Sequence, residues 1–422
     1  MKGRNYTWVI VALCFLMVFT CLGFCSSNSS LYLNAITEAL DIKRSIYSLT
    51  NSFRFVTTAI INLFFGRLVS RYGTKKLIGA GFLSLITAML LYAHAENVVL
   101  FYLGGIFLGI GMSWTTTTMV GSVVNKWCKK NRGTVMGAVL AANGLGGALA
   151  AQIVTPIIYQ EGNAFGYRSA YKLVACILLV VGTLVLIFFR ENPKGQENAP
   201  TVVHKKKARG QAWVGMDFSE AKKHTYFYVA ATCIFFTGFV LQGVNGTASA
   251  HMKDVGLDMG YVATVLSAHS IALTCFKFLT GFLYDRFGLR VTMTICDIAA
   301  LVAMLSLALL TGNSTGAALA MIYGVISSLA LPLETIMLPI FANDFFGDKS
   351  YNKMLGIFVS VNTAGYALGG PVMNLIYDMC GSYKPMFIAC ALMMAVITIV
   401  SQFTITSFHR RRDEIIRENE TV

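Results

Sequence analysis

The chain has 422 residues, of which 55% are apolar types and only 13% are charged, whereas a soluble domain carries roughly a quarter charged residues. So few charges exclude a mainly water-facing surface. The formal charge of +14 does not indicate a nucleic-acid partner, because the basic residues lie in short loops between apolar blocks. The 10 cysteines lie mostly inside these blocks without metal-ligand spacing, so neither a metal site nor another cofactor is predicted.

Twelve apolar blocks follow one another along the chain, each approaching the roughly 20 residues that cross a bilayer as a helix. The first set begins near Trp8, Ile46, Leu77, Val98, Gly133 and Ala170, and the second near Tyr226, Val262, Val291, Thr315, Leu355 and Pro385. The first block could be a signal peptide, but the many similar spans behind it favour a retained helix. We predict an all-α membrane protein of twelve transmembrane helices in two pseudo-symmetric six-helix bundles.

A long polar stretch between the two sets predicts the domain organisation. Residues 1–189 form the N-terminal bundle, 190–225 a cytoplasmic linker, 226–409 the C-terminal bundle and 410–422 a cytoplasmic tail. If the N-terminus lies inside, 26 of the 34 Lys and Arg residues fall in inner segments and 6 in outer ones. This bias predicts a multi-pass protein of the plasma (inner) membrane with both termini cytoplasmic. The two remaining cations, Arg54 and Lys277, lie within the membrane.

An internal repeat supports the division into halves. The segment Gly66–Gly73 (GRLVSRYG) recurs as Gly281–Gly288 (GFLYDRFG), and both copies follow the second helix of their half. A weaker repeat pairs Gly137 and Asn143 with Gly356 and Asn362. Repeats of this kind, related by an axis along the membrane normal, build many transporters.

The repeated segment, extended to Lys76 and Arg290, resembles the loop signature of the major facilitator superfamily. The resemblance covers essentially the whole chain and implies a cytoplasmic gate formed by Gly66, Arg71, Gly73, Asp285, Arg286 and Gly288. In the first copy Ser70 replaces the usual aspartate, which weakens the charge network expected on that side.

Two further stretches narrow the resemblance. They are Trp127–Gly133, which leads into the glycines of helix 5, and Phe346–Tyr383, which carries Gly369-Gly370-Pro371. They look like the monocarboxylate transporters and the oxalate:formate antiporters, which bind substrate with an arginine of helix 8, where this chain has Lys277. The proton-coupling aspartate of the monocarboxylate transporters is replaced by Leu273. The second cation of the oxalate relatives, a lysine of helix 11, is replaced by Asn362.

The two intramembrane cations are the leading candidates for substrate binding. Lys277 stands about 12 Å along its helix from the inner end, and Arg54 stands about as far from the outer end of helix 2. A lysine at such depth costs roughly 2.5–3.5 kcal/mol on insertion scales, so each cation should face a cavity and have a partner, such as an anion. Alternatively, Lys277 pairs with Glu334, and Arg54 with another polar group.

Other polar residues of the spans supply further candidates. Substrate contacts are predicted for Asn143, Asn362, Ser270 and Asn28, because a membrane amide must find partners and Ser270 shares the face of Lys277. His269 and Glu334 are candidates for proton coupling. Asp297 is expected near the inner boundary, paired with a loop arginine and apart from the substrate.

These observations predict a secondary active transporter of a small organic anion, a monocarboxylate or small dicarboxylate. It would work by alternating access as an antiporter or proton symporter, as a monomer whose other partners are membrane lipids and protons. The alternative is a carrier for a larger or neutral solute, with the intramembrane charges internally paired. An enzyme is not indicated, because no His-Glu-x-x-His motif or nucleophile-base pair is present. A sensor would be expected to carry a sizeable soluble output domain.

Overall fold

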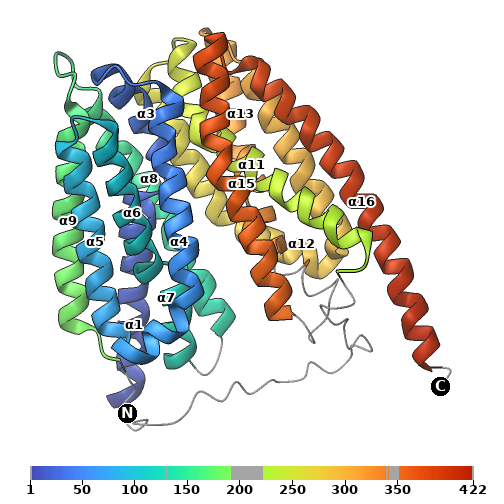
Figure 1. Cartoon of the computed structure of the whole chain (residues 1–422). Helices are drawn as coiled ribbons and strands as arrows, with labels where there is room; N and C mark the ends of the chain where they lie inside the picture. Colours follow the sequence, from blue (N-terminus) through green and yellow to red (C-terminus); the bar gives the residue numbers. More distant parts are fainter. Residues whose placement is uncertain (1, 129–131, 192–221, 339–340, 342–350, 421–422) are drawn as a thin grey trace.

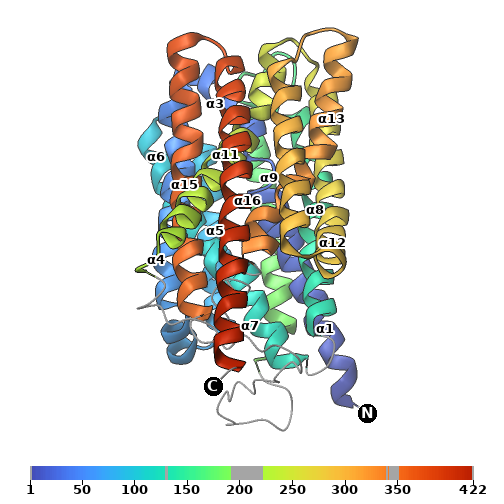
Figure 2. The same ribbon diagram turned by 90° about the vertical axis from the view of Figure 1, so that its right-hand side faces the viewer.

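The computed structural model describes residues 2–128, 132–191, 222–338, 341 and 351–420. Within these ranges the chain forms helices joined by short loops, and no strand is present. Most of the predicted linker lies outside the described residues. Both ends of the chain lie at the same end of the bundle, which we call the termini end, and the opposite end is called the far end (Figures 1 and 2).

The N-terminal half contains six spans, two of which are interrupted. Its elements are α1 (Lys2–Met17), the π-helical turn η1 (Val18–Leu22), α2 (Gly23–Cys25), α3 (Ser29–Ala39), α4 (Arg44–Tyr72), α5 (Thr74–His94), α6 (Val98–Thr115), α7 (Thr117–Trp127), α8 (Arg132–Ile158) and α9 (Gly166–Phe188). The first span is one path from α1 to α3 with a break after Cys25, and the fourth joins α6 to α7 across Thr116. The break in the first span exposes the serines at 26, 27 and 29 to the centre of the molecule.

The C-terminal half repeats this plan. Its elements are α11 (Thr225–Asp254), α12 (Met259–Ala308), α13 (Ser314–Ala330), the π-helical turn η2 (Leu333–Met337), α15 (Tyr351–Cys380) and α16 (Lys384–Glu420). Helix α12 contains two spans, because Gly288 has φ 77° and the chain turns there. Only glycine adopts this left-handed region readily.

Ten spans in the described ranges are long and apolar enough to cross a membrane. The two other predicted spans are α4, with 29 residues, and α15, with 30, and both run the length of the bundle (Figure 1). Each faces the opposite half and presents polar side chains to a central cavity, so it needs less apolar surface than a helix surrounded by lipid. The predicted twelve-helix fold in two halves is confirmed.

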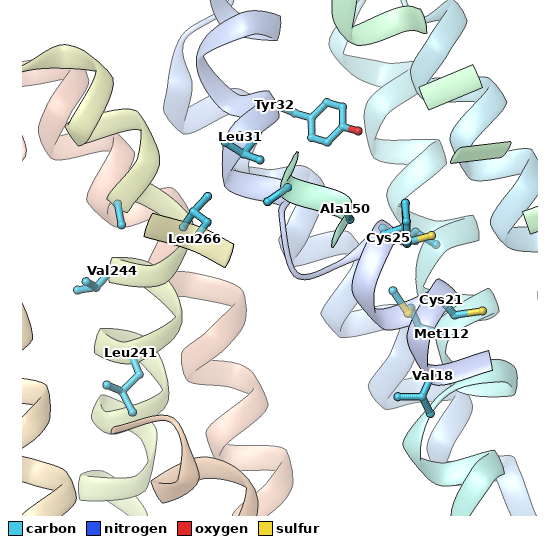
Figure 3. Close-up of a cluster of buried hydrophobic side chains, with 14 of the residues drawn as sticks. Val18, Cys21, Cys25, Leu31, Tyr32, Met112, Ala150, Leu241, Val244 and Leu266 are labelled. Atoms are coloured by element: carbon cyan, nitrogen blue, oxygen red, sulfur yellow. The ribbon is translucent and has the colours of Figure 1, made fainter. Parts of the chain in front are cut away.

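Buried apolar side chains of both halves form one continuous cluster. Figure 3 shows Val18, Cys21, Cys25 and Met112 packed together in the N-terminal half, and Leu241 and Val244 on the facing helix of the C-terminal half. The cysteines at 14, 21 and 25 are buried as small apolar residues and form no disulfide. With apolar side chains filling both bundles, the central polar residues gather mainly between them.

The halves meet mainly along two helix pairs, α4 with α15 and α8 with α12, and α3 also packs on α11. Hydrogen bonds join described residues of the two halves at several levels. At the far end Arg44 of α4 donates to Asp254 of α11, and farther along Thr274 Oγ1 of α12 donates to the carbonyl oxygen of Ala141 of α8 at 3.3 Å. Toward the termini end the two halves diverge, with α1 and α16 well apart in Figure 1. The structure is therefore closed at the far end.

Candidate functional site

A cavity of about 280 Å³ lies between the two halves. The break in the first span, α4 and α8 line one side, and α11, α12, η2 and α15 line the other. Its polar walls include Ser26, Ser27, Asn51, Arg54 and Asn143 from the N-terminal half, and Gln242, Asn245, His269, Ser270, Lys277, Glu334, Tyr366 and Asn374 from the C-terminal half. Six of the eight residues predicted for substrate or coupling roles thus line one space.

Arg54 is held on α4 by neutral neighbours. Its Nη1 donates to Ser26 Oγ at 2.8 Å, and its guanidinium carbon lies 4.3 Å from the centre of the Phe55 ring. The residue is 7% exposed, and its Nε has no hydrogen-bond partner. Ser26 is therefore the polar partner that the sequence did not identify, but no carboxylate of the described residues forms an ion pair with Arg54.

Lys277 lines the cavity from α12 and is half-buried. The ion pairs that join described residues are Arg44–Asp254 and Lys253–Glu38, so the alternative pairing of Lys277 with Glu334 is not formed. Glu334 Oε2 accepts instead from Gln242 Nε2 at 3.4 Å, and its Oε1 is buried without a partner. Both predicted cations therefore face the cavity, and neither has a carboxylate partner among the described residues.

The predicted amides lie in different environments. Asn143 lines the cavity, and its Oδ1 accepts from Ser27 Oγ at 2.9 Å. Asn28 instead donates from Nδ2 to the carbonyl oxygen of Gly147 at 2.8 Å and is buried beside the cavity. Asn362 packs against Gly238 of α11 and lines a separate, smaller pocket, so the structure does not bring it to the predicted site.

His269 reaches the cavity but is tied to α13. Its Nδ1 lies 3.0 Å from the carbonyl oxygen of Gly324 and 3.0 Å from Ser327 Oγ. Because a carbonyl oxygen only accepts, Nδ1 carries the proton, and Nε2 of the neutral ring is left as an acceptor. Ser270, the next residue, is buried and also lines the cavity, as its position on the lysine face predicts.

Several cavity residues were not identified from the sequence. Gln242 and Asn245 stand three residues apart in an apolar span, and Tyr366 and Asn374 lie on α15. The signal for the first two was present, because intramembrane amides one helical turn apart share a face and need polar partners.

The two repeated loops have the same backbone turn. Gly73 has φ 80° and Gly288 has φ 77°. Beside Gly73, the Glu191 Oε1 accepts from the backbone N–H of Lys75 at 2.8 Å, at the start of α5. A carboxylate from beyond α9 is thus present near the loop in which Ser70 replaces the usual aspartate. Arg71 and Arg286 are exposed, and the side chain of Asp285 lies outside the described residues.

Asp297 differs from the expectation that it pairs with a loop arginine. It is 2% exposed inside the C-terminal half, and its Oδ2 has no hydrogen-bond partner. No ion pair to it occurs in the described ranges. The expectation placed it too near the membrane boundary, because the second span of α12 begins several residues earlier than the apolar block indicated.

Comparison with known proteins agrees with this architecture. The family model of the Major Facilitator Superfamily matches residues 13–241 and again 230–421. The Uncharacterized MFS-type transporter YcxA of Bacillus subtilis is 21% identical over 402 residues, covering 92% of this chain and 93% of the relative. Human Monocarboxylate transporter 2 is 21% identical, covering 79% and 71%, and Sialic acid transporter NanX of Escherichia coli is 20% identical, covering 88% of each.

Solved structures show the same fold. The crystal structure of the nucleoside transporter NupG superimposes with a TM-score of 0.74 at 14% identity, covering 94% of this chain and 99% of that one. A bacterial homologue of the human lysosomal transporter Spinster, solved inward-facing and unoccupied, gives 0.72 at 14% identity, covering 97% and 98%. The two matches of the family model together span nearly all of this chain. The chain therefore belongs to the major facilitator superfamily of membrane transporters.

Proposed function

We propose that the chain is a secondary active transporter of a small organic anion, a monocarboxylate or small dicarboxylate. The observation that carries this proposal is that Arg54 and Lys277, one from each half, line one cavity without a carboxylate partner among the described residues. Charged groups at membrane depth need a counter-charge, and a bound carboxylate would supply it.

The remaining walls suit the same class of solute. Glu334 is the one carboxylate among the described residues of the cavity wall, so two cations face one acid. The guanidinium of Arg54 has donors left over from its bond to Ser26, and Lys277 offers a mobile point charge. Hydroxyl and amide groups around them can bind further oxygens of the solute. The cavity of about 280 Å³ is many times the roughly 10–15 Å³ that one water needs by this measure.

Two relatives carry acids according to their names, a monocarboxylate and sialic acid, and this adds support. Alternating access would expose the cavity first at one end and then at the other. The closed far end corresponds to one of these two states. The basic-residue bias supports the inward-facing one, in a plasma (inner) membrane with cytoplasmic termini. We further propose that it acts as a monomer, by antiport or proton symport, with His269 and Glu334 as the groups of the cavity that could carry a proton.

The second candidate is a carrier for a larger or neutral solute. The abundance of amide and hydroxyl groups on the cavity wall favours it, but it requires internal pairing of the two cations, and neither has a carboxylate partner in the described ranges.

A thermal-unfolding screen separates the two proposals. Purified protein is heated with lactate, pyruvate, formate, oxalate or sialic acid, and with a nucleoside and a neutral sugar. A ligand at 100 times its dissociation constant stabilises by about 2.7 kcal/mol, so a true substrate raises the unfolding temperature. The proposal expects a response to carboxylates, whereas a response only to neutral solutes contradicts it.

A further inference from the structure

A second pocket lies inside the C-terminal half, and its mostly apolar wall carries a small set of polar side chains. Its volume is about 50 Å³, and it shares no lining residue with the central cavity. Side chains from four helices meet there, with Thr237 on α11, Asp297 on α12, Asn362 on α15, and Ser401 and Thr404 on α16. A pocket of this size has room for more than one water-sized group, since one water needs roughly 10–15 Å³ by this measure.

Asp297 brings a buried carboxyl group to this pocket, and no cationic side chain among the described residues pairs with it. It is 2% exposed, its Oδ2 accepts no hydrogen bond, and the described lining residues include no Lys, Arg or His. The other titratable group of the described wall is the thiol of Cys233. An ionised carboxylate in such surroundings is costly unless a cation pairs with it.

The neighbouring polar groups are oriented as acceptors. The hydroxyls of Thr237 and Thr404 each donate to a carbonyl oxygen one turn earlier in their own helix, at 2.8 Å, and Ser401 does so at 3.0 Å. Their hydrogens are therefore engaged, and only lone pairs remain for the pocket. Asn362 uses its Nδ2 on the carbonyl oxygen of Ile234 at 3.1 Å, which leaves its Oδ1 available.

We propose that this pocket is a binding site for a small monovalent cation, sodium, held by the Asp297 carboxylate and by the oxygens of Asn362, Thr237, Ser401 and Thr404. Hard cations prefer such oxygen ligands. A proton on Asp297 would need one acceptor, whereas side-chain oxygens from three further helices line the same pocket. The site stands independently of the central cavity. A role for the cation in driving transport of the solute rests on the proposed function.

The test measures sodium binding without any organic solute. Full-length purified protein is heated in sodium chloride and in choline chloride of equal ionic strength, and bound ²²Na⁺ is counted in parallel. Sodium is expected to raise the unfolding temperature by about 2–4 °C. In Asp297→Asn this shift disappears and sodium binding falls at least tenfold. The matched variant Glu334→Gln, which alters the buried acid of the other cavity, keeps the sodium response.

Thr404→Val, close in volume to the original side chain, removes one oxygen and is expected to weaken sodium binding severalfold, so the proposal remains testable if Asp297→Asn fails to fold. An unfolding temperature that is the same in sodium and choline overturns the proposal, as does one that follows pH alone. Full sodium binding in Asp297→Asn or Thr404→Val also overturns it. Because no solute is added, these outcomes leave the anion proposal untouched.

Discussion

The guanidinium of Arg44 binds the carboxylate of Asp254 through two bonds, with Nη1 2.5 Å from Oδ2 and Nη2 2.8 Å from Oδ1, and so joins α4 of one half to α11 of the other. The Arg44 guanidinium also lies 4.0 Å above the Tyr377 ring. Burial raises the pKa of the Tyr383 hydroxyl, which stays protonated and donates to Asn374 Oδ1 at 2.5 Å. Arg44 also contacts the hydroxyl of Tyr383. Because Asn374, the acceptor of that hydroxyl, lines the cavity, the far-end closure is connected to the cavity wall.

Removing either member of this ion pair should open the far end. A bidentate, partly buried pair of this kind contributes about 1–3 kcal/mol to the closed state, so Arg44→Gln or Asp254→Asn should raise the open fraction about five-fold or more. The measurement is the labelling rate, from the far side, of a cysteine placed at cavity residue Asn51, with a membrane-impermeant maleimide. Exchanging the pair, Arg44→Asp with Asp254→Arg, should slow the labelling again. Unchanged labelling in both single variants would show that the pair does not hold the closure.

Close packing of α8 on α12 should depend on Gly144. A Cβ at this position would lie 1.9 Å from Thr274 Oγ1 and 2.3 Å from the carbonyl oxygen of Ser270. Gly144→Ala must therefore push the two helices apart, which favours the far-open state and increases the same cysteine labelling. The control is Gly121→Ala, whose added Cβ would meet only the end of Met136, at 3.5 Å. Equal labelling rates in the two variants would mean that this contact places no constraint on the closed state.

The two repeated turns should differ in their tolerance of a side chain. Gly73→Ala and Gly288→Ala both put alanine at positive φ with ψ of 158° and 177°, a region that essentially only glycine adopts, at a cost of about 1–3 kcal/mol. A Cβ at Gly288 meets no atom within 4 Å, whereas one at Gly73 lies 2.6 Å from Glu191 Oε1, which caps α5. Gly73→Ala should therefore lose about 0.5–1 kcal/mol more, measured as unfolding in detergent. Adding Glu191→Ala should remove the difference, and an equal or larger loss at Gly288 would contradict the assignment.

The helices were predictable because an apolar span in lipid must form its backbone hydrogen bonds within itself, as a helix does, and because the bilayer sets the length of the span. The rotation of each helix was harder to predict, since it depends on packing. Asn143 and Asn362 are equivalent in the repeat, yet Asn143 faces the cavity, whereas Asn362 lies against Gly238 and faces the smaller pocket. The contact between Gly238 and the amide of Asn362 depends on how α11 and α15 pack, so it can be recognised only once both helices are positioned.

The candidate site was predicted in part. Arg54 and Lys277 stand out in the sequence, because topology explains every other basic residue, and both line the cavity. The ion pair between Arg44 and Asp254 was not predicted, because both residues lie at the ends of helices, where charges are ordinary. The serines at 26 and 27 reach the cavity because the first span is interrupted there, and the polar run SSNSS at residues 26–30 was the signal in the sequence for that break.

The most direct measurement is the dissociation constant of the carboxylate that gives the largest thermal shift, compared between the unaltered protein and Lys277→Gln. Loss of a charged hydrogen bond of about 1.5–3 kcal/mol predicts a rise of at least tenfold. The control Lys172→Gln, at an exposed lysine of α9, should bind as the unaltered protein does. Lys277→Ala and Lys277→Gln should also abolish uptake into proteoliposomes while unfolding at nearly the same temperature. Unaltered affinity and uptake in folded Lys277→Gln would contradict an anion held between Arg54 and Lys277.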